Sequence, residues 1–377
     1  MEYAAVALFA ALITFFTVPL VKRLSMSTGQ VVAPGGRMVH TRATPTLGGL
    51  GMLLGFLGAF ALAGSMHQFR AVFFDSSEPV GVVLAAIAIA VVGALDDIFD
   101  LSAPAKVAGQ VISSSLLWLF GVTMFWFKVP FAGVVVLSSS ITPLLTAIWV
   151  IAMENAINLI DGLDGLAAGI VAIASLAFGI YSVHLTSLGQ LPGSSIGPLI
   201  AFSTFGACVG FLPHNWNPAK IFMGDTGAML LGLLLAASTS VVGGRTANVS
   251  DQTFFFFAPL FIPFLILGVP MADMAFAFAR RTAHRVSFAI PDTKHLHHRL
   301  VEMGHGPRRS VAILWAWTAI LSAFALVPTF IPALAAELPI AILAVAVLLY
   351  TLFHPDRKGS RSGGRRRRRA VGQSPQP

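Results

Sequence analysis

The segment "VGVVLAAIAIAVVGALDDIFD" (80–100) joins a continuous apolar run to three aspartates. Its apolar part is close to the length that a helix needs to cross the hydrocarbon core of a bilayer. The whole chain is 56% hydrophobic and only 11% charged, which excludes the soluble globular class. We therefore expect an all-α polytopic membrane protein with about eleven transmembrane helices. The apolar runs that predict these helices lie at about 3–21, 47–64, 80–95, 104–120, 141–155, 163–183, 197–213, 227–243, 254–279, 311–330 and 338–353.

Basic residues are distributed unequally between the segments that join these runs. If the N-terminus lies outside, the outer segments hold only Arg70, Lys128 and Arg245, and the remaining Lys and Arg fall inside. Lys and Arg in short loops favour the cytoplasmic side of a membrane. An odd number of helices then places the C-terminus, the most basic segment, inside as well. We therefore predict an outside N-terminus and a cytoplasmic C-terminus.

The sequence divides into one polytopic domain, 1–354, and a basic tail, 355–377. The tail consists mainly of Gly, Ser, Arg and Pro without apolar periodicity, so we expect it to be disordered. Its run of arginines, 365–369, follows an inner-facing helix, which favours contact with anionic lipid headgroups over binding of nucleic acid. The longest polar segment between helices, 280–310, is also predicted to be cytoplasmic, and loops of that length are often functional. On the outer side, the Val-rich part of 122–140 is expected to form a small strand element.

Five clusters of polar residues fall on the predicted cytoplasmic face. They lie within 36–51, 94–102, 154–169, 214–227 and 292–300. A single aspartate at a membrane helix end is usually a solvated or capping residue. Carboxylates there are costly to desolvate, however, and five clusters on one face indicate a functional site.

Two of these clusters have a spacing that suggests a shared face. If the helix of the opening segment continues, Asp96 and Asp100 lie one turn apart on the same face and would attract a cation. In a continuing helix, Asn155, Asn158 and Asp161 would lie within a 120° sector. The two Asp-Gly pairs that follow predict a break at the membrane boundary, because Gly tolerates the bend.

The donor set favours a hard metal ion. Several carboxylates and a single cysteine suit Mg²⁺, with Mn²⁺ as a second choice, and Mg²⁺ in proteins commonly binds substrate phosphate. The segment 224–227 places Asp225 beside the amides of a helix start, where anionic ligands are stabilised. The histidines at 295, 297 and 298 with neighbouring basic residues suit a pyrophosphate, and a zinc site is the alternative for them.

The sequence resembles the polyprenyl-phosphate N-acetylhexosamine-1-phosphate transferases. The motifs "DDIFD", "NAINLIDGLDGL", "NPAKIFMGDTG" and "HLHHRL" occur in the order of that family, as do "PTLGG" and "VPMADMAFAFARR". The closest likeness is to the bacterial branch that uses UDP-N-acetylglucosamine. The resemblance implies a multi-pass enzyme of the bacterial inner membrane with a cytoplasmic active site. It would transfer N-acetylglucosamine 1-phosphate from UDP-N-acetylglucosamine to a polyprenyl phosphate, release UMP and start a lipid-linked cell-envelope glycan; a homodimer is compatible with it.

The motif positions also imply roles for individual residues. Asp96 and Asp97 resemble the catalytic aspartates, Asp225 the main Mg²⁺ ligand and Asn158 a second ligand. The positions that resemble substrate-binding residues are His40, Arg42, Thr46, Asn155, Asp161, Asp164, Asn215, Phe222, His295, His297, His298 and Arg299.

Three other interpretations remain open from the sequence. The same chemistry could use another UDP-N-acetylhexosamine, although the short form "KHLHHRL" argues against a muramoyl-pentapeptide substrate. A cation-coupled transporter also carries intramembrane carboxylates, but its site lies near the bilayer midplane and not at helix ends. A CDP-alcohol phosphotransferase would have a longer Asp-Gly and Ala-Arg signature than "DGLDGLAAG".

Overall fold

The computed structural model describes residues 1–32, 43–129, 133–243, 306–331 and 333–353. Every predicted apolar run corresponds to a helix in it except 254–279, which lies outside the described residues. By length and composition, eight of the described helices can cross a membrane; α5 and the apolar part of α14 are shorter. The all-α polytopic class is thus confirmed, whereas the count of eleven stays a prediction. The long helices are α1 (Glu2–Ser27), α2 (Gly48–Ser65), α4 (Glu78–Phe99), α5 (Ala103–Leu119), α6 (Thr142–Ile160), α7 (Leu166–Ser187), α8 (Gly197–Asn215), α9 (Gly224–Gly243), α13 (Pro307–Leu326) and α14 (Ala333–Phe353).

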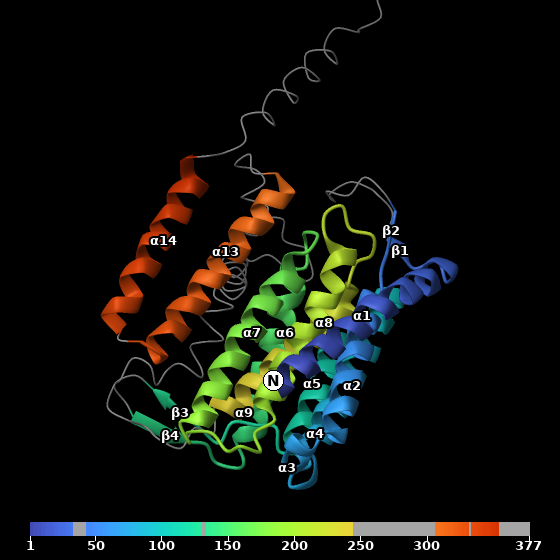
Figure 1. The fold of residues 1–377 in the computed structure, drawn as a ribbon. Helices are drawn as coiled ribbons and strands as arrows, with labels where there is room; N and C mark the ends of the chain where they lie inside the picture. The colour runs from blue at the N-terminus through green and yellow to red at the C-terminus, as the bar shows by residue number, and fades with distance from the viewer. Residues whose placement is uncertain (33–42, 130–132, 244–305, 332, 354–377) are drawn as a thin grey trace, which may run out of the picture.

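Helix α9 is the centre of the bundle (Figure 1). It is predominantly apolar, and residues 226–242 are all buried. It packs mainly against α4 and α6, with further contacts to α8, α2 and α7. On the periphery, α1 packs against α8 and α2, and α13 packs against α7. Any group at the start of α9 is therefore held by several neighbouring helices at once.

Glycines set the closest helix crossings. A Cβ atom on Gly232 of α9 would lie 2.7 Å from the backbone nitrogen of Glu154 in α6. A Cβ atom on Gly93 of α4 would lie 2.5 Å from the Cα atom of Thr226 in α9. Small residues allow such approaches between membrane helices, where packing replaces the hydrophobic driving force.

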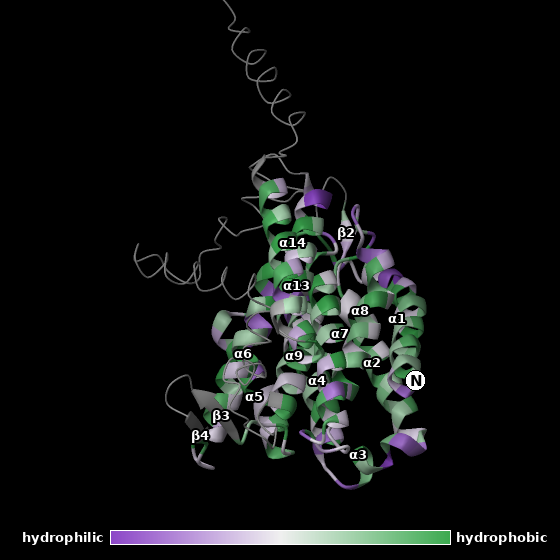
Figure 2. Cartoon of the chain, turned by 60° about the vertical axis from the view of Figure 1, so that its left-hand side comes forward, coloured by the Kyte–Doolittle hydropathy of each residue, from purple (hydrophilic) through white to green (hydrophobic). Residues whose placement is uncertain are grey.

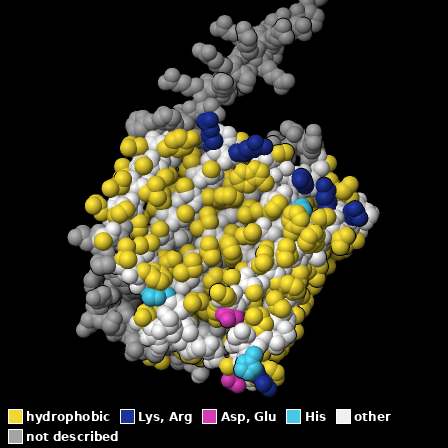
Figure 3. Space-filling model, in the orientation of Figure 1, with side chains coloured by type: hydrophobic (Ala, Val, Ile, Leu, Met, Phe, Trp, Pro, Cys, Tyr) yellow, Lys and Arg dark blue, Asp and Glu magenta, His cyan; other side chains and the backbone are white. Residues whose placement is uncertain are grey.

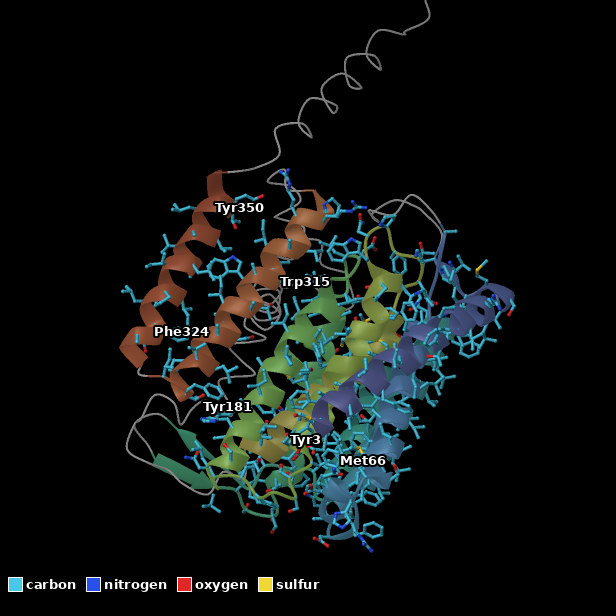
Figure 4. All side chains as sticks on the ribbon, viewed as in Figure 1. Tyr3, Met66, Tyr181, Trp315, Phe324 and Tyr350 are labelled. Atoms are coloured by element: carbon cyan, nitrogen blue, oxygen red, sulfur yellow. The ribbon has the colours of Figure 1, made fainter. Side chains whose placement is uncertain are left out.

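The surface and the two ends of the bundle fit a membrane environment. Apolar side chains cover most of the visible face, and the helices are predominantly hydrophobic (Figures 2 and 3). Most of the Lys and Arg side chains on this face gather toward the end where α13 begins (Figures 1 and 3). Trp315 on α13 lies toward α7, where its indole N–H donates to the carbonyl oxygen of Leu166 at 3.3 Å (Figure 4).

Short elements complete the described fold. The strands β3 (Trp126–Val129) and β4 (Gly133–Val136) pair antiparallel, with Trp126 opposite Val136. The predicted strand element in 122–140 is therefore confirmed. A second small pair joins β1 (Val31–Val32) to β2 (Thr44–Pro45). The 3-10 helix η1 (His67–Phe69) and α3 (Arg70–Phe74) connect α2 to α4, and η3 (Val327–Thr329) follows α13.

Helix ends correct one expectation and confirm another. Asp96 and Asp100 do not share a helix face, because α4 ends at Phe99 and Asp100 adopts a left-handed backbone with φ 50°. Asp tolerates this conformation better than most residues, and Asp100 is exposed. The predicted break after α6 is present: α6 ends at Ile160, and α7 begins after Gly165, which has φ 76°.

Candidate active site

A polar site lies where α4, α6 and α8 end and where α5, α7 and α9 begin. Its centre is an ion-pair cluster of three charged side chains. The Lys106 ammonium forms an ion pair with Asp96 and lies 3.2 Å from Oδ2 of Asp225. The Asp96 side chain is only 4% exposed, whereas Lys106 and Asp225 are 31% and 29% exposed. The cluster therefore joins α4, α5 and α9 and is open to ligands on the side of Lys106 and Asp225.

Asp97 accepts hydrogen bonds from the start of α9, whereas its neighbour Asp96 pairs with Lys106. Its Oδ1 accepts a hydrogen bond from the backbone N–H of Asp225 at 2.9 Å. Its Oδ2 accepts two bonds from Thr226, one from the backbone N–H at 3.1 Å and one from the hydroxyl at 2.6 Å. Helix starts leave unpaired N–H groups, and here a carboxylate from another helix pairs with them.

The end of α6 contributes amide and carboxyl groups to the same place. The Asn158 side chain lies beside the Asp225 carboxylate. Asn155 lies one turn earlier, and its amide donates to Oε1 of Gln110 on α5 at 3.2 Å. Asp161 follows the last residue of α6, and burial raises its pKa to about 8, with smaller contributions from the carboxylates of Asp225, Asp97 and Asp164. The predicted residues of this segment thus come together, although Asp161 lies beyond the helix.

A second set of contacts shapes the loop between α8 and α9. Oδ2 of Asp164 accepts hydrogen bonds from Nδ2 of Asn217 at 2.8 Å and from the backbone N–H of Ala219 at 3.0 Å. Arg308 in the first turn of α13 donates to the carbonyl oxygen of Asn217 at 2.8 Å and to its side-chain oxygen at 3.2 Å. The chain Arg308–Asn217–Asp164 therefore connects α13 to the start of α7.

The remaining described candidates lie along this loop and beside α2. Asn215 is buried; its side chain accepts from the N–H of Gly165 at 2.9 Å and donates to the carbonyl oxygen of Ile221 at 3.0 Å. Phe222 is partly buried and is held through its backbone by Pro45 and Gly48. Thr46 is buried beside them. His40, Arg42, His295, His297, His298 and Arg299 lie outside the described residues, as do the basic tail and most of 280–310; the last part of that segment begins α13 at Pro307.

The residues at the centre fit a magnesium ion better than a transition metal. Asp96 and Asp225 supply carboxylate oxygens and Asn158 supplies an amide, which are the hard donors that Mg²⁺ prefers. Within the described part of the chain there is no group of three or more His, Cys, Asp or Glu side chains placed to hold a metal. A bound ion would therefore complete its coordination with water or with substrate phosphate, as Mg²⁺ commonly does.

Four contributors were not predicted as site residues: Lys106, Gln110, Asn217 and Arg308. Lys106 had a readable signal, because Ser102 and Pro104 mark a helix start directly after the aspartate cluster and put a lysine in its first turn. Gln110 follows one turn later on the same helix. The other two act through a contact between segments more than ninety residues apart, which spacing does not reveal.

Comparisons with known proteins find similarity over most of the chain. The model of glycosyl transferase family 4 matches residues 79–243, which include the whole ion-pair cluster. The chain is 39% identical over 331 residues to the decaprenyl-phosphate N-acetylglucosaminephosphotransferase of Mycobacterium tuberculosis, covering 85% of this chain and 81% of the relative. It is 34% identical over 323 residues to a probable undecaprenyl-phosphate N-acetylglucosaminyl 1-phosphate transferase of Bacillus subtilis, covering 85% and 84%. It is 29% identical over 329 residues to the phospho-N-acetylmuramoyl-pentapeptide-transferase of Staphylococcus saprophyticus, covering 82% and 94%.

Proposed function

The chain belongs to glycosyl transferase family 4, and from that membership we propose that it transfers N-acetylglucosamine 1-phosphate from UDP-N-acetylglucosamine to a polyprenyl phosphate and releases UMP. The observation that carries the proposal is the cluster of Asp96, Lys106 and Asp225 at the mouth of the helix bundle. Acidic groups there suit a cation that accompanies a diphosphate, and the apolar flanks of the bundle suit a lipid acceptor. The relatives that carry N-acetylglucosamine in their names have higher identities than the muramoyl-pentapeptide transferase, which favours the former sugar.

The proposed cofactor is Mg²⁺, held by Asp225 and Asp96 with Asn158 beside them, and Mn²⁺ is the second choice. When bound, the ion neutralises charge on the diphosphate of the sugar nucleotide, as in other phosphoryl transfers. Lys106 contributes a positive charge at the same place. Together, the ion and Lys106 would reduce the repulsion between two anionic substrates, so the contribution of the protein is chiefly positioning and electrostatic stabilisation.

The reaction itself is one displacement at phosphorus. An oxygen of the lipid phosphate attacks the β-phosphorus of UDP-N-acetylglucosamine and forms a new P–O–P bond. The bond between the β-phosphorus and the bridging oxygen breaks, and UMP leaves with that electron pair. A phosphate monoester is largely doubly ionised near neutral pH, so the attacking oxygen requires little or no assistance from a base.

We further propose that the site faces the cytoplasm of a bacterial inner membrane. The gathering of Lys and Arg toward the site end of the bundle supports this orientation (Figure 3). A test uses single cysteines at two exposed positions, Lys220→Cys near the site and Asp75→Cys at the opposite end; the native Cys208 is buried. Impermeant thiol reagents on intact cells should label the second variant and spare the first. Labelling of Lys220→Cys alone would reverse the orientation.

The activity is tested with the purified full-length chain in detergent. Wild type supplied with UDP-N-acetylglucosamine and polyprenyl phosphate should release UMP and form the lipid-linked sugar, and Asp225→Asn should lose more than nine-tenths of that activity. UDP-N-acetylgalactosamine and UDP-muramoyl-pentapeptide are the matched competing substrates. UMP release from either of these in preference to UDP-N-acetylglucosamine would change the assigned sugar. No UMP release by wild type from any of the three nucleotides would refute the transferase assignment.

A further inference from the structure

We propose that Asp97 is a positioning residue that holds the start of α9, and with it Asp225, and is not the base for the lipid phosphate. The inference deepens the proposed function and rests on it. Its starting point is the division between two adjacent aspartates. Asp96 pairs with Lys106, whereas Asp97 pairs with the first residues of α9.

The acceptor capacity of the Asp97 carboxylate is nearly used up. A carboxylate has about four lone-pair positions, and three of them accept the hydrogen bonds from Asp225 and Thr226. Two of the donors are unpaired N–H groups at a helix start, where the helix dipole also favours a negative charge. A base needs a free oxygen directed at its substrate, so this arrangement serves the protein and not a reactant.

The backbone around Asp97 is shaped for the same contact. Gly93 lies one turn before Asp97 on α4, and its missing side chain lets the backbone of Thr226 approach. Gly224 is the first residue of α9 and has φ 69°, and a Cβ atom there would lie 2.6 Å from Oδ1 of Asp97. The crossing of α4 and α9 therefore leaves room for the Asp97 carboxylate directly against the start of α9.

Asp97 affects the centre of the site through Asp225. Asp225 is the first residue after Gly224, so its side chain is directed by the turn that Asp97 fixes. From that turn Asp225 meets Lys106 and Asn158. Loss of the Asp97 carboxylate should loosen the first turn of α9 and disperse this cluster, even though Asp97 forms no ion pair with Lys106 in the described part of the chain.

The test compares Asp97→Asn and Thr226→Val with two matched controls, Thr226→Ser, which keeps the hydroxyl, and Asp100→Asn, which changes an exposed aspartate outside the cluster. Hydrogen–deuterium exchange is measured on purified, substrate-free and metal-free protein for the peptide that contains 224–230. A hydrogen bond to a charged group is worth enough to change an opening equilibrium about tenfold. We expect exchange there to accelerate about tenfold in Asp97→Asn and Thr226→Val, and to match wild type in both controls.

Activity supplies the second measurement. Thr226→Val leaves the carboxylate of Asp97 in place, so a base role predicts wild-type turnover for this variant, whereas the positioning role predicts a loss of about tenfold that Thr226→Ser restores. Thr226→Val with normal turnover and normal exchange would overturn the proposal, as would an inactive Asp97→Asn with unchanged exchange. Should Asp97→Asn fail to fold, the two Thr226 variants decide. A wild type that releases no UMP would refute the function alone, because the exchange measurement needs no substrate.

Discussion

Replacement of Lys106 by Met tests the ion-pair cluster directly. The side chain keeps its length and loses its charge, so Asp96 and Asp225 face each other without a cation. At 3.2 Å and an effective dielectric constant of about 20, the pair with Asp225 alone has a Coulomb energy of about 5 kcal/mol. Desolvation of both groups and their exposure of about 30% reduce the net effect, so we expect a loss of about 2 kcal/mol. For a chain of this size, that corresponds to a fall in melting temperature of about 2–3 °C.

The assay is thermal unfolding of detergent-solubilised protein in the presence of a chelator and then of millimolar Mg²⁺. The metal should raise the melting temperature of Lys106→Met more than that of wild type, because the ion takes over the neutralisation of the two carboxylates. Lys220→Met, at an exposed lysine, is the control and should melt like wild type in both conditions. An unchanged melting temperature for Lys106→Met, or an equal effect of Mg²⁺ on both proteins, would refute the reasoning.

Three other changes probe separate parts of the molecule. Between about pH 4 and pH 8, the raised pKa of Asp161 means that the folded state keeps a proton that the unfolded chain has lost, so the stability of the fold falls as pH rises. In metal-free buffer, the melting temperature of Asp161→Asn should therefore exceed that of wild type by a margin that grows from pH 5 to pH 8. A margin that stays constant with pH would contradict this. Arg308→Ala should raise the KM for UDP-N-acetylglucosamine about fivefold with little change in kcat, because Asn217, which binds Asp164, loses its hydrogen bonds to Arg308. Steady-state kinetics test this, and an unaltered KM would show that Arg308 does not act on substrate binding through Asn217 and Asp164. Gly232→Ala should destabilise the protein by about 1–3 kcal/mol through its collision with α6, whereas Gly193→Ala, with nothing within 4 Å, should not; equal melting temperatures would count against the tight crossing.

Much of the architecture was predictable because membrane helices must satisfy two simple conditions, length and apolarity. The segment 80–100 shows how far this goes: its apolar part predicts α4, and its aspartates mark the site. Helix boundaries were predictable where local residues mark them, as Gly165 does before α7. The end of α4 was missed because Asp100 stops the helix with a backbone conformation that sequence patterns assign mainly to Gly and Asn.

The residues of the site were largely predictable from the sequence, but the contacts between their side chains were not. The family resemblance gave Asp96 and Asp97 one shared catalytic role, whereas adjacent residues on a helix point about 100° apart and here contact different helices. The partnership of Asp164 with Asn217 depends on the fold of the loop after α8, and that of Lys106 with Asp225 depends on a crossing of two distant helices. Such contacts depend on tertiary packing, which the periodicity of the sequence does not predict.

The burial of α9 has a practical consequence for handling the protein. Asp225 lies in the first turn of the most enclosed of the described helices, so this end of α9 cannot fray without exposing apolar surface that several neighbours cover. Enzymes with a peripheral site often inactivate on warming well before they unfold. Here the loss of turnover and the collapse of the fold should coincide, and a detergent or lipid that slows unfolding should lengthen the active lifetime of the preparation by the same factor.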